Sequence, residues 1–218
     1  FCIIIQFIIM DIQKFNNIGQ IYIISAPSGA GKTSLVKAIC GNNTSIKPSV
    51  SYTTRKKRDS EIEGKDYFFI SKKEFHEKIN KGEFLEYQNV YGNLYGTSID
   101  STLNVVNQGH DIILEIDYKG MLIVKEILPQ STSIYILPPN IEALKRRLDL
   151  RGQDQSKTVE LRMKSSEREL SYAKFADYTI VNDIFSDALR NITAIILFGK
   201  LKSPQIINWI KSVSMQNN

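Results

Sequence analysis

The chain has 218 residues, 42% of them hydrophobic and 23% charged, with a formal net charge of +5. A chain of this length and composition can bury a full core and is typical of one globular domain with appended or inserted lobes. The positive charge fits nucleic acid, an acidic membrane surface or small anions, but the densest basic run, residues 55–58, is too short for a nucleic-acid tail. We expect a compact site for small anions, with neither nucleic acid nor a membrane as partner. The sequence leaves monomer or homo-oligomer open.

The cysteines and histidines argue against two further kinds of site. Cys2 and Cys40 are too few and too far apart for a disulfide framework or a zinc knuckle. We therefore expect reduced thiols and a cytoplasmic location. His76 and His110 have no second ligand at helical spacing, so no zinc site is expected.

Residues 1–17 are expected to be an extension in front of the domain. The first ten are apolar apart from Gln6, but a membrane-spanning helix needs about 20 apolar residues. The segment also lacks the positively charged start and the small-residue cleavage site of a signal peptide. Because Met10 opens a polar segment, our hypothesis is that translation starts there. A disordered or sheet-edge extension is the alternative.

Four short apolar runs rich in Ile, Val and Tyr are separated by helical patterns. Such runs are typical of buried parallel strands, and their alternation with helices predicts an α/β fold with a central parallel sheet flanked by helices. The strands are predicted at residues 20–25, 111–116, 132–137 and 178–181. A helix is predicted at residues 32–40, ending at Gly41, which would supply a left-handed cap.

Three other stretches differ from this core pattern. Residues 48–100 carry short Tyr- and Phe-rich segments with turn glycines, which predict an inserted small mixed sheet around a helix at residues 72–81. Residues 140–174 are charged and helix-forming, a pattern that suits a helical lid. A last amphipathic helix is predicted at residues 186–201, before a tail of unknown role.

The first predicted strand and helix are joined by a Gly-rich turn with the pattern of a phosphate-binding P-loop. Gly29 and Gly31 allow the backbone N–H groups to turn inward around phosphate oxygens, and the helix N-terminus adds positive potential. Lys32 would reach the β- and γ-phosphates of ATP, and the Thr33 hydroxyl would ligate a bridging Mg²⁺. The predicted ATP-binding residues of this turn are Ala26, Pro27, Ser28, Gly29, Ala30, Gly31, Lys32 and Thr33.

One position departs from the strict P-loop pattern. Ala26 stands where the pattern has Gly, so we expect a negative φ there. A purely structural Gly-rich corner is the alternative interpretation of the turn. The pair Lys32-Thr33 at the start of the helix, with two correctly spaced glycines, argues against it.

A second anion site is predicted in the inserted stretch. Arg55 and Arg58 are three residues apart, close enough for both guanidinium groups to bind one phosphate with bidentate hydrogen bonds. Tyr67 and Tyr95 could donate their hydroxyl groups to the same phosphate. Taken separately, each of these residues fits a surface charge or a core aromatic residue equally well.

Several motifs occur in an order that resembles guanylate kinase, a family of P-loop nucleoside monophosphate kinases. The resemblance runs from Gln20 to about Phe198 through the motifs S-x-P-S-G-x-G-K, T-T-R-x-x-R, G-K-D-Y, E-F-L-E, Y-G-N-x-Y-G-T, L-E-I-D-x-x-G, R-L-x-x-R-G and I-V-N-D. It implies the fold of that family and Mg²⁺-dependent transfer of the γ-phosphoryl group of ATP to GMP and dGMP, in purine nucleotide metabolism. It divides residues 18–202 into a core (18–47, 101–139 and 175–202), a GMP-binding lobe (48–100) and a lid (140–174), followed by a tail (203–218).

The resemblance also implies which residues bind GMP: Arg55, Arg58, Tyr67 and Tyr95 at its phosphate, and Ser51, Glu86, Thr97 and Asp117 at guanine. Base chemistry agrees with the second group. Guanine presents donors at N1 and N2 for a carboxylate such as Glu86, and an acceptor at O6 for a hydroxyl such as that of Ser51 or Thr97. Adenine inverts this pattern, so we expect a strong preference for GMP over AMP.

Glu115 and Asp117 end a predicted buried strand, where a carboxylate can orient Mg²⁺-bound water, and we assign Thr33 and Glu115 to the metal. The resemblance suggests that Asn182 touches the adenine of ATP, although Asn after a strand is also a common turn residue. The predicted catalytic residues are Lys32, Arg55, Arg58, Arg151 and Arg162, with Arg147 a weaker candidate in the lid.

Two alternatives belong to other classes of function. Guanylate-kinase-like domains of scaffold proteins have lost phosphoryl transfer and bind phosphorylated peptides, but the intact P-loop argues against such a module here. The other alternative is a different small-molecule kinase on a P-loop scaffold, in which Glu86 and Ser51 would have no reason to match guanine.

Overall fold

The computed structural model of the protein describes residues 18–90, 92–150 and 168–199. The predicted N-terminal extension and C-terminal tail lie outside these residues, as do Arg151, Arg162 and the middle of the predicted lid. None of the helices in the described part is long and apolar enough to cross a membrane.

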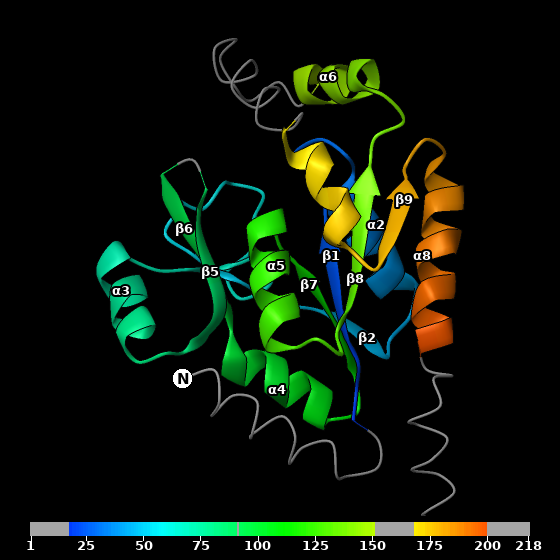
Figure 1. The fold of residues 1–218 in the computed structure, drawn as a ribbon. Coiled ribbons are helices and arrows are strands. Elements are labelled where there is room, and N and C mark those ends of the chain that lie inside the picture. The colour runs from blue at the N-terminus through cyan, green and yellow to red at the C-terminus, as the bar shows by residue number, and fades with distance from the viewer. Residues whose placement is uncertain (1–17, 91, 151–167, 200–218) are drawn as a thin grey trace, which may run out of the picture.

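A five-stranded parallel sheet forms the centre of the molecule, as the α/β prediction required (Figure 1). Its strands, in spatial order, are β2 (Ile46–Pro48), β7 (Asp111–Glu115), β1 (Ile21–Ser25), β8 (Thr132–Leu137) and β9 (Tyr178–Val181). The edge strand β2 is absent from the predicted elements because its three residues, ending in proline, carry too little pattern to be recognised. The carboxyl ends of these parallel strands lie together at one edge of the sheet, where the predicted P-loop follows β1.

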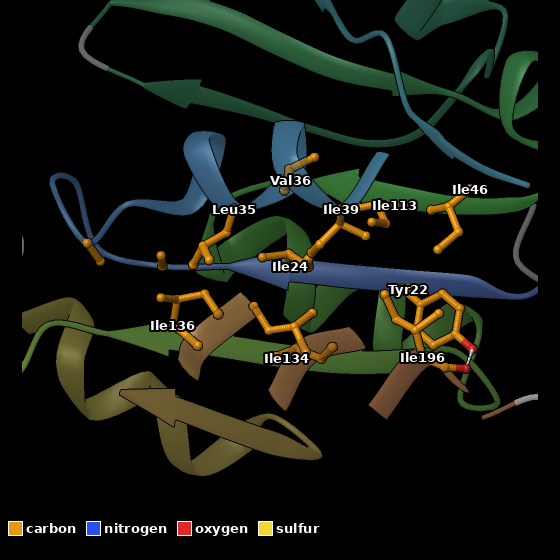
Figure 2. Close-up of a cluster of buried hydrophobic side chains, with 14 residues drawn as sticks. Tyr22, Ile24, Leu35, Val36, Ile39, Ile46, Ile113, Ile134, Ile136 and Ile196 are labelled. Atoms are coloured by element: carbon orange, nitrogen blue, oxygen red, sulfur yellow. Dashed lines mark hydrogen bonds between the residues drawn. The ribbon is translucent and has the colours of Figure 1, made fainter. Parts of the chain in front are cut away.

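Helices cover both faces of this sheet. On one face, α2 (Lys32–Asn42) and α8 (Phe185–Gly199) bury their apolar sides against β1 and β8. Figure 2 shows Leu35 and Ile39 of α2 beside Ile24 of β1 in this cluster. On the other face, α4 (Ile99–Asn107) and α5 (Tyr118–Ile127) pack on β7 and β1. Burial of both faces explains why the central strands are continuous apolar runs.

The predicted end of the first helix at Gly41 is wrong. The helix α2 continues through Gly41 to Asn42, and its C-cap is Asn43 in an extended conformation. The side chain of Asn43 accepts hydrogen bonds from the backbone N–H and the hydroxyl of Ser45, at 3.0 and 2.7 Å. This Asn turn ends the helix, so no left-handed glycine is needed.

The inserted stretch forms a second, mixed sheet with strand order β4 (Phe68–Phe69), β3 (Tyr52–Thr53), β6 (Asn93–Ser98) and β5 (Phe84–Val90). Strands β3 and β4 are parallel, and the other pairs are antiparallel. The helix α3 (Lys72–Asn80) begins with a capping box between Ser71 and Glu74. Figure 1 shows this lobe beside α5, and β5 contacts that helix. The contact brings residues of the small sheet close to the carboxyl edge of the large one.

The chain leaves β8 into α6 (Ile141–Leu150) and returns through a short 3₁₀ helix, η1 (Ser171–Phe175), to β9. Figure 1 shows α6 beyond the carboxyl ends of β8 and β9. Tyr172 of η1 stacks on Tyr118 of α5 with ring centroids 4.0 Å apart. The predicted lid therefore begins at the same edge of the sheet as the P-loop, and η1 leads from that edge toward the start of β9, where Asp177 accepts from the Ser133 N–H at 2.7 Å.

Candidate functional site

The predicted P-loop connects the carboxyl end of β1 to α2. Gly29 and Gly31 have φ values of 90° and 95°, a region that glycine enters without strain. Gly31 is the N-cap of α2, with no side-chain cap and no acidic residue in the first turn. The N–H groups at this helix end, and the positive potential that accompanies them, remain available for an anion.

Lys32 and Thr33 meet the end of the neighbouring strand β7. The Lys32 ammonium donates to the Ile116 carbonyl at 2.8 Å, and the Thr33 hydroxyl donates to the Glu115 carboxylate. The two residues assigned to the metal are thus in direct contact. A hydroxyl and a carboxylate are oxygen donors that suit Mg²⁺, which commonly takes few protein ligands and keeps phosphate and water for the rest. No group of three or more His, Cys, Asp or Glu side chains that could hold a metal occurs among the described residues.

Asn182 and Arg147 lie against the P-loop. The buried amide of Asn182 donates from Nδ2 to the Ala30 carbonyl at 2.8 Å. Arg147 donates from Nη2 to the Asn182 carbonyl at 2.9 Å and from Nη1 to the Ala30 carbonyl at 3.4 Å. A Cβ at Gly31 would lie 2.4 Å from the Asn182 Nδ2. Sequence reasoning placed Asn182 at adenine and Arg147 in the lid, and it gave no signal of this support for the loop.

Three of the four residues predicted at the GMP phosphate form one cluster in the small sheet. The Arg55 Nε donates to the Tyr95 hydroxyl at 3.2 Å, and the Arg55 guanidinium lies 5.5 Å from the centre of the Tyr67 ring. The rings of Tyr67 and Tyr95 meet edge to face at 5.8 Å. Burial raises the pKa of Tyr67 to about 12, so its hydroxyl stays a proton donor. The fourth residue, Arg58, is exposed nearby.

Glu61 belongs to this cluster and was missed by sequence reasoning. Its carboxylate accepts from the Arg55 Nη2 at 2.7 Å and from Nη1 at 3.1 Å. The Arg55 guanidinium, which was predicted to bind a phosphate through two hydrogen bonds, therefore makes its two-bond contact with Glu61 in this structure. Residue spacing alone gives no hint of this pair, because a glutamate between two charged turns looks like an ordinary surface residue.

The predicted guanine site lies where the small sheet meets α5. Glu86 is only 5% exposed, and its Oε1 accepts from the Thr97 hydroxyl at 2.7 Å. Burial raises the pKa of Glu86 to about 7, and the charge of Asp117 adds to this rise. Asp117 caps α5 by accepting from the Gly120 N–H at 2.9 Å. A Cβ at Gly120 would lie 2.7 Å from the Glu86 Oε2, so an alanine there would force this carboxylate to shift.

Ser51 is half-buried in the same lobe, but its hydroxyl bonds to none of the other predicted guanine residues. Its carbonyl accepts from the Phe68 N–H at 2.9 Å and fixes the start of β4. The structure thus brings together Glu86, Thr97 and Asp117, whereas the place of Ser51 in the site stays a prediction.

The two anion sites are electrostatically linked. The positive charge of Lys32 lowers the pKa of Glu86, against the larger effect of burial, and the negative charge of Glu115 raises that of Tyr67. Each of these effects joins a residue of the P-loop region to a residue of the small sheet. The arrangement can hold a polyphosphate at the P-loop, beside Lys32, and a monophosphate in the small lobe, beside Arg55.

Comparisons with known proteins are consistent along most of the chain. A family model described as guanylate kinase matches residues 18–197. Guanylate kinase of Pseudomonas fluorescens (strain Pf0-1) is 45% identical over 184 residues, which cover 84% of this chain and 89% of that protein. Guanylate kinase of Thiobacillus denitrificans is 48% identical over 177 residues, or 81% of this chain and 85% of that protein. The crystal structure of guanylate kinase from Anaplasma phagocytophilum matches with a TM-score of 0.71 and 31% identity, covering 87% of this chain and 90% of that chain.

Proposed function

This chain belongs to the guanylate kinase family, and from that premise we propose how its residues transfer the γ-phosphoryl group of ATP to GMP, giving ADP and GDP. The observation that carries the assignment is the pairing of two sites. A P-loop with Lys32 at its end faces a lobe that holds Arg55 beside Tyr95 and a buried Glu86. Phosphoryl transfer requires such an arrangement, since donor and acceptor must lie in line.

The P-loop side binds ATP. The backbone of residues 26–31 and the N-terminus of α2 surround the β- and γ-phosphates, and Lys32 exchanges the Ile116 carbonyl for a phosphate oxygen. Thr33 and Glu115 hold Mg²⁺, which when bound neutralises charge on the phosphates. Asn182 already donates to Ala30, so any contact with adenine uses the remaining polar atoms of its amide.

The small sheet binds GMP and dGMP. Arg55, Arg58, Tyr67 and Tyr95 hold the phosphate, and Glu86 accepts from guanine N1 and N2 while Ser51 or Thr97 donates to O6. Asp117, close to Glu86, completes the polar lining of the base site. An adenine in this site would place an acceptor against the Glu86 carboxylate, which accounts for selectivity.

Catalysis consists of positioning and charge neutralisation. The GMP phosphate oxygen is already a competent nucleophile, so no general base is needed. Lys32, Arg55 and Arg58 align the reacting phosphates, and Arg151 and Arg162 of the lid, which lie outside the described residues, neutralise charge on the transferred group. We place the reaction in the cytoplasm, where Cys40 remains a free thiol.

Steady-state kinetics with both substrates test this assignment. Arg55→Gln should raise the KM for GMP and leave the KM for ATP within about threefold, because it removes a charge-assisted bond to one substrate only. Thr33→Val should raise the Mg²⁺ concentration needed for half-maximal turnover. Equal changes in both KM values for Arg55→Gln would contradict the separation of the two sites.

A further inference from the structure

Glu61 is joined to both arginines of the phosphate cluster. Its carboxylate binds the Arg55 guanidinium through two hydrogen bonds, at 2.7 and 3.1 Å, and also accepts from the backbone N–H of Arg58 at 2.8 Å. The side chains of Arg55 and Glu61 are 17% and 13% exposed. A pair so deeply screened from water is held more firmly than a surface ion pair.

The bonds of Arg55 leave a specific part of the guanidinium free. A guanidinium has five N–H donors. The Nε–H goes to the Tyr95 hydroxyl, the two on Nη1 go to the Lys56 carbonyl and to Glu61, and one on Nη2 goes to Glu61. The second Nη2 N–H is the one donor with no partner among the described residues. Glu61 thus fixes the plane of the guanidinium and leaves one donor for a ligand.

Glu61 is itself fixed by its own turn. Its N–H donates to the Arg58 carbonyl at 3.1 Å, and its carbonyl accepts from the Lys57 ammonium at 3.1 Å. If a ligand displaced the carboxylate, the Arg58 N–H would lose its partner and a largely buried charge would be left unpaired. Glu61 is therefore built to remain in place when an anion binds.

We propose that Glu61 is a positioning residue for the acceptor phosphate. Glu61 aligns the Arg55 guanidinium and fixes the backbone turn at Arg58, so that both arginines can bind the phosphate. This inference rests on the proposed function, because it takes the GMP phosphate as the ligand of the two arginines. The opposite account is that Glu61 is a resident counter-ion, which blocks Arg55 and must leave before GMP binds. The two accounts predict KM changes of opposite sign.

The test uses the full 218-residue chain with Glu61 changed to Gln and to Ala. A glutamine has the shape of glutamate, but one of the two acceptor oxygens becomes an NH₂ group. In either orientation of the amide, this NH₂ group would face an N–H donor of Arg55 or Arg58. If Glu61 positions the arginines, both variants raise the KM for GMP by about 10- to 100-fold, the scale of a lost charged hydrogen bond. The KM for ATP stays within about threefold of wild type.

Guanosine provides a readout that general damage to the lobe would change. Because guanosine lacks the phosphate, its inhibition constant as a competitor of GMP should be the same in wild type and in the Glu61 variants. Glu83→Gln is the matched control, since Glu83 pairs with Lys78 at 2.7 Å in the same lobe and touches neither arginine. This variant should leave both KM values and guanosine inhibition unchanged.

Three results would overturn the inference. A lower KM for GMP in the Glu61 variants would identify a blocking counter-ion, an unchanged KM would remove Glu61 from the site, and weaker inhibition by guanosine would indicate damage to the whole lobe. Arg55→Gln, measured in parallel, separates these results from a failure of the proposed function. If Arg55→Gln raises the KM for GMP and Glu61→Gln does not, only the role of Glu61 is lost; if neither does, the phosphate site itself is misassigned.

Discussion

The binding of guanine should depend on pH through Glu86. Burial raises the pKa of this carboxyl from 4.5 to about 7, whereas binding to guanine N1 and N2 needs the ionised form. With this pKa, about half of the free protein is ionised near pH 7 and about a tenth near pH 6. The affinity for the base should therefore fall about tenfold as the pH is lowered from about 8 to about 6.

Guanosine inhibition measures this effect without interference from the substrate phosphate, which itself titrates near pH 6. The inhibition constant of guanosine against GMP should rise about tenfold over that range in wild type. In Glu86→Gln the constant should be higher, by about 10- to 100-fold at about pH 8, and independent of pH. A wild-type constant that does not change with pH would show that Glu86 does not control binding of the base, and so would a Gln variant with the same pH dependence.

The same carboxyl should make folding more favourable at low pH, although low pH weakens the binding of guanine. Glu86 keeps its proton to a higher pH in the folded chain than in the unfolded chain, so its contribution favours folding at low pH and is lost as the pH rises from about 4.5 to about 7. The rise in pKa corresponds to a cost of about 3 kcal/mol for the ionised form above pH 7. Glu86→Gln keeps the acceptor for Thr97 and should raise the unfolding free energy at about pH 8 by up to this amount, as measured by urea unfolding without ligand.

Lys32→Ala should lower kcat by about 10²- to 10³-fold with little change in folding stability, because it removes a charge that stabilises the phosphoryl group during transfer. Single-turnover kinetics measure this loss, and a loss smaller than about tenfold would contradict the role of Lys32. Gly31→Ala should cost about 1–3 kcal/mol of stability, since φ is 95° and the new Cβ meets Asn182. Gly41→Ala should be neutral or stabilise the chain by up to about 1 kcal/mol, because Gly41 lies inside a helix and its new Cβ would meet no other atom. Thermal unfolding of the two variants compares these effects, and equal changes in stability would contradict both expectations. Asn182→Ala removes the shorter of two hydrogen bonds to the Ala30 carbonyl and should raise the KM for ATP more than that for GMP. An unchanged KM for ATP would show that this bond does not shape the loop.

Features with a strong local pattern were predictable from the sequence. The continuous apolar strands and the P-loop carry their own signal, because a buried parallel strand and a strand-turn-helix phosphate site each demand particular residues at fixed spacing. The positive φ of Gly29 and Gly31 follows from that pattern. The contact between Thr33 and Glu115 does not, because it joins residues 82 positions apart in the sequence. The position of Glu86 was inferred from the family resemblance, since a lone glutamate in a strand has no periodic signal.

Features that depend on tertiary neighbours were not predictable. The local pattern predicts a helix cap at Gly41 because glycine favours that role, but the turn at Asn43 ends the helix instead. The pairing of Glu61 with Arg55 and the support that Asn182 gives to the P-loop depend on which side chains come together in three dimensions. Local spacing contains no information on such contacts, and alternative partners have similar chemistry.

The most direct test of the account is ADP formation from ATP and Mg²⁺ with GMP, dGMP, AMP, CMP or UMP as acceptor. We expect turnover with GMP and dGMP and a kcat/KM for AMP lower by about 10⁴-fold or more, because adenine leaves the buried Glu86 carboxylate without donors. Comparable turnover with AMP would contradict the assignment of Glu86 to the base. Folded protein that binds ATP and phosphorylates none of these acceptors would show that the small lobe does not bind a nucleoside monophosphate as the phosphoryl acceptor.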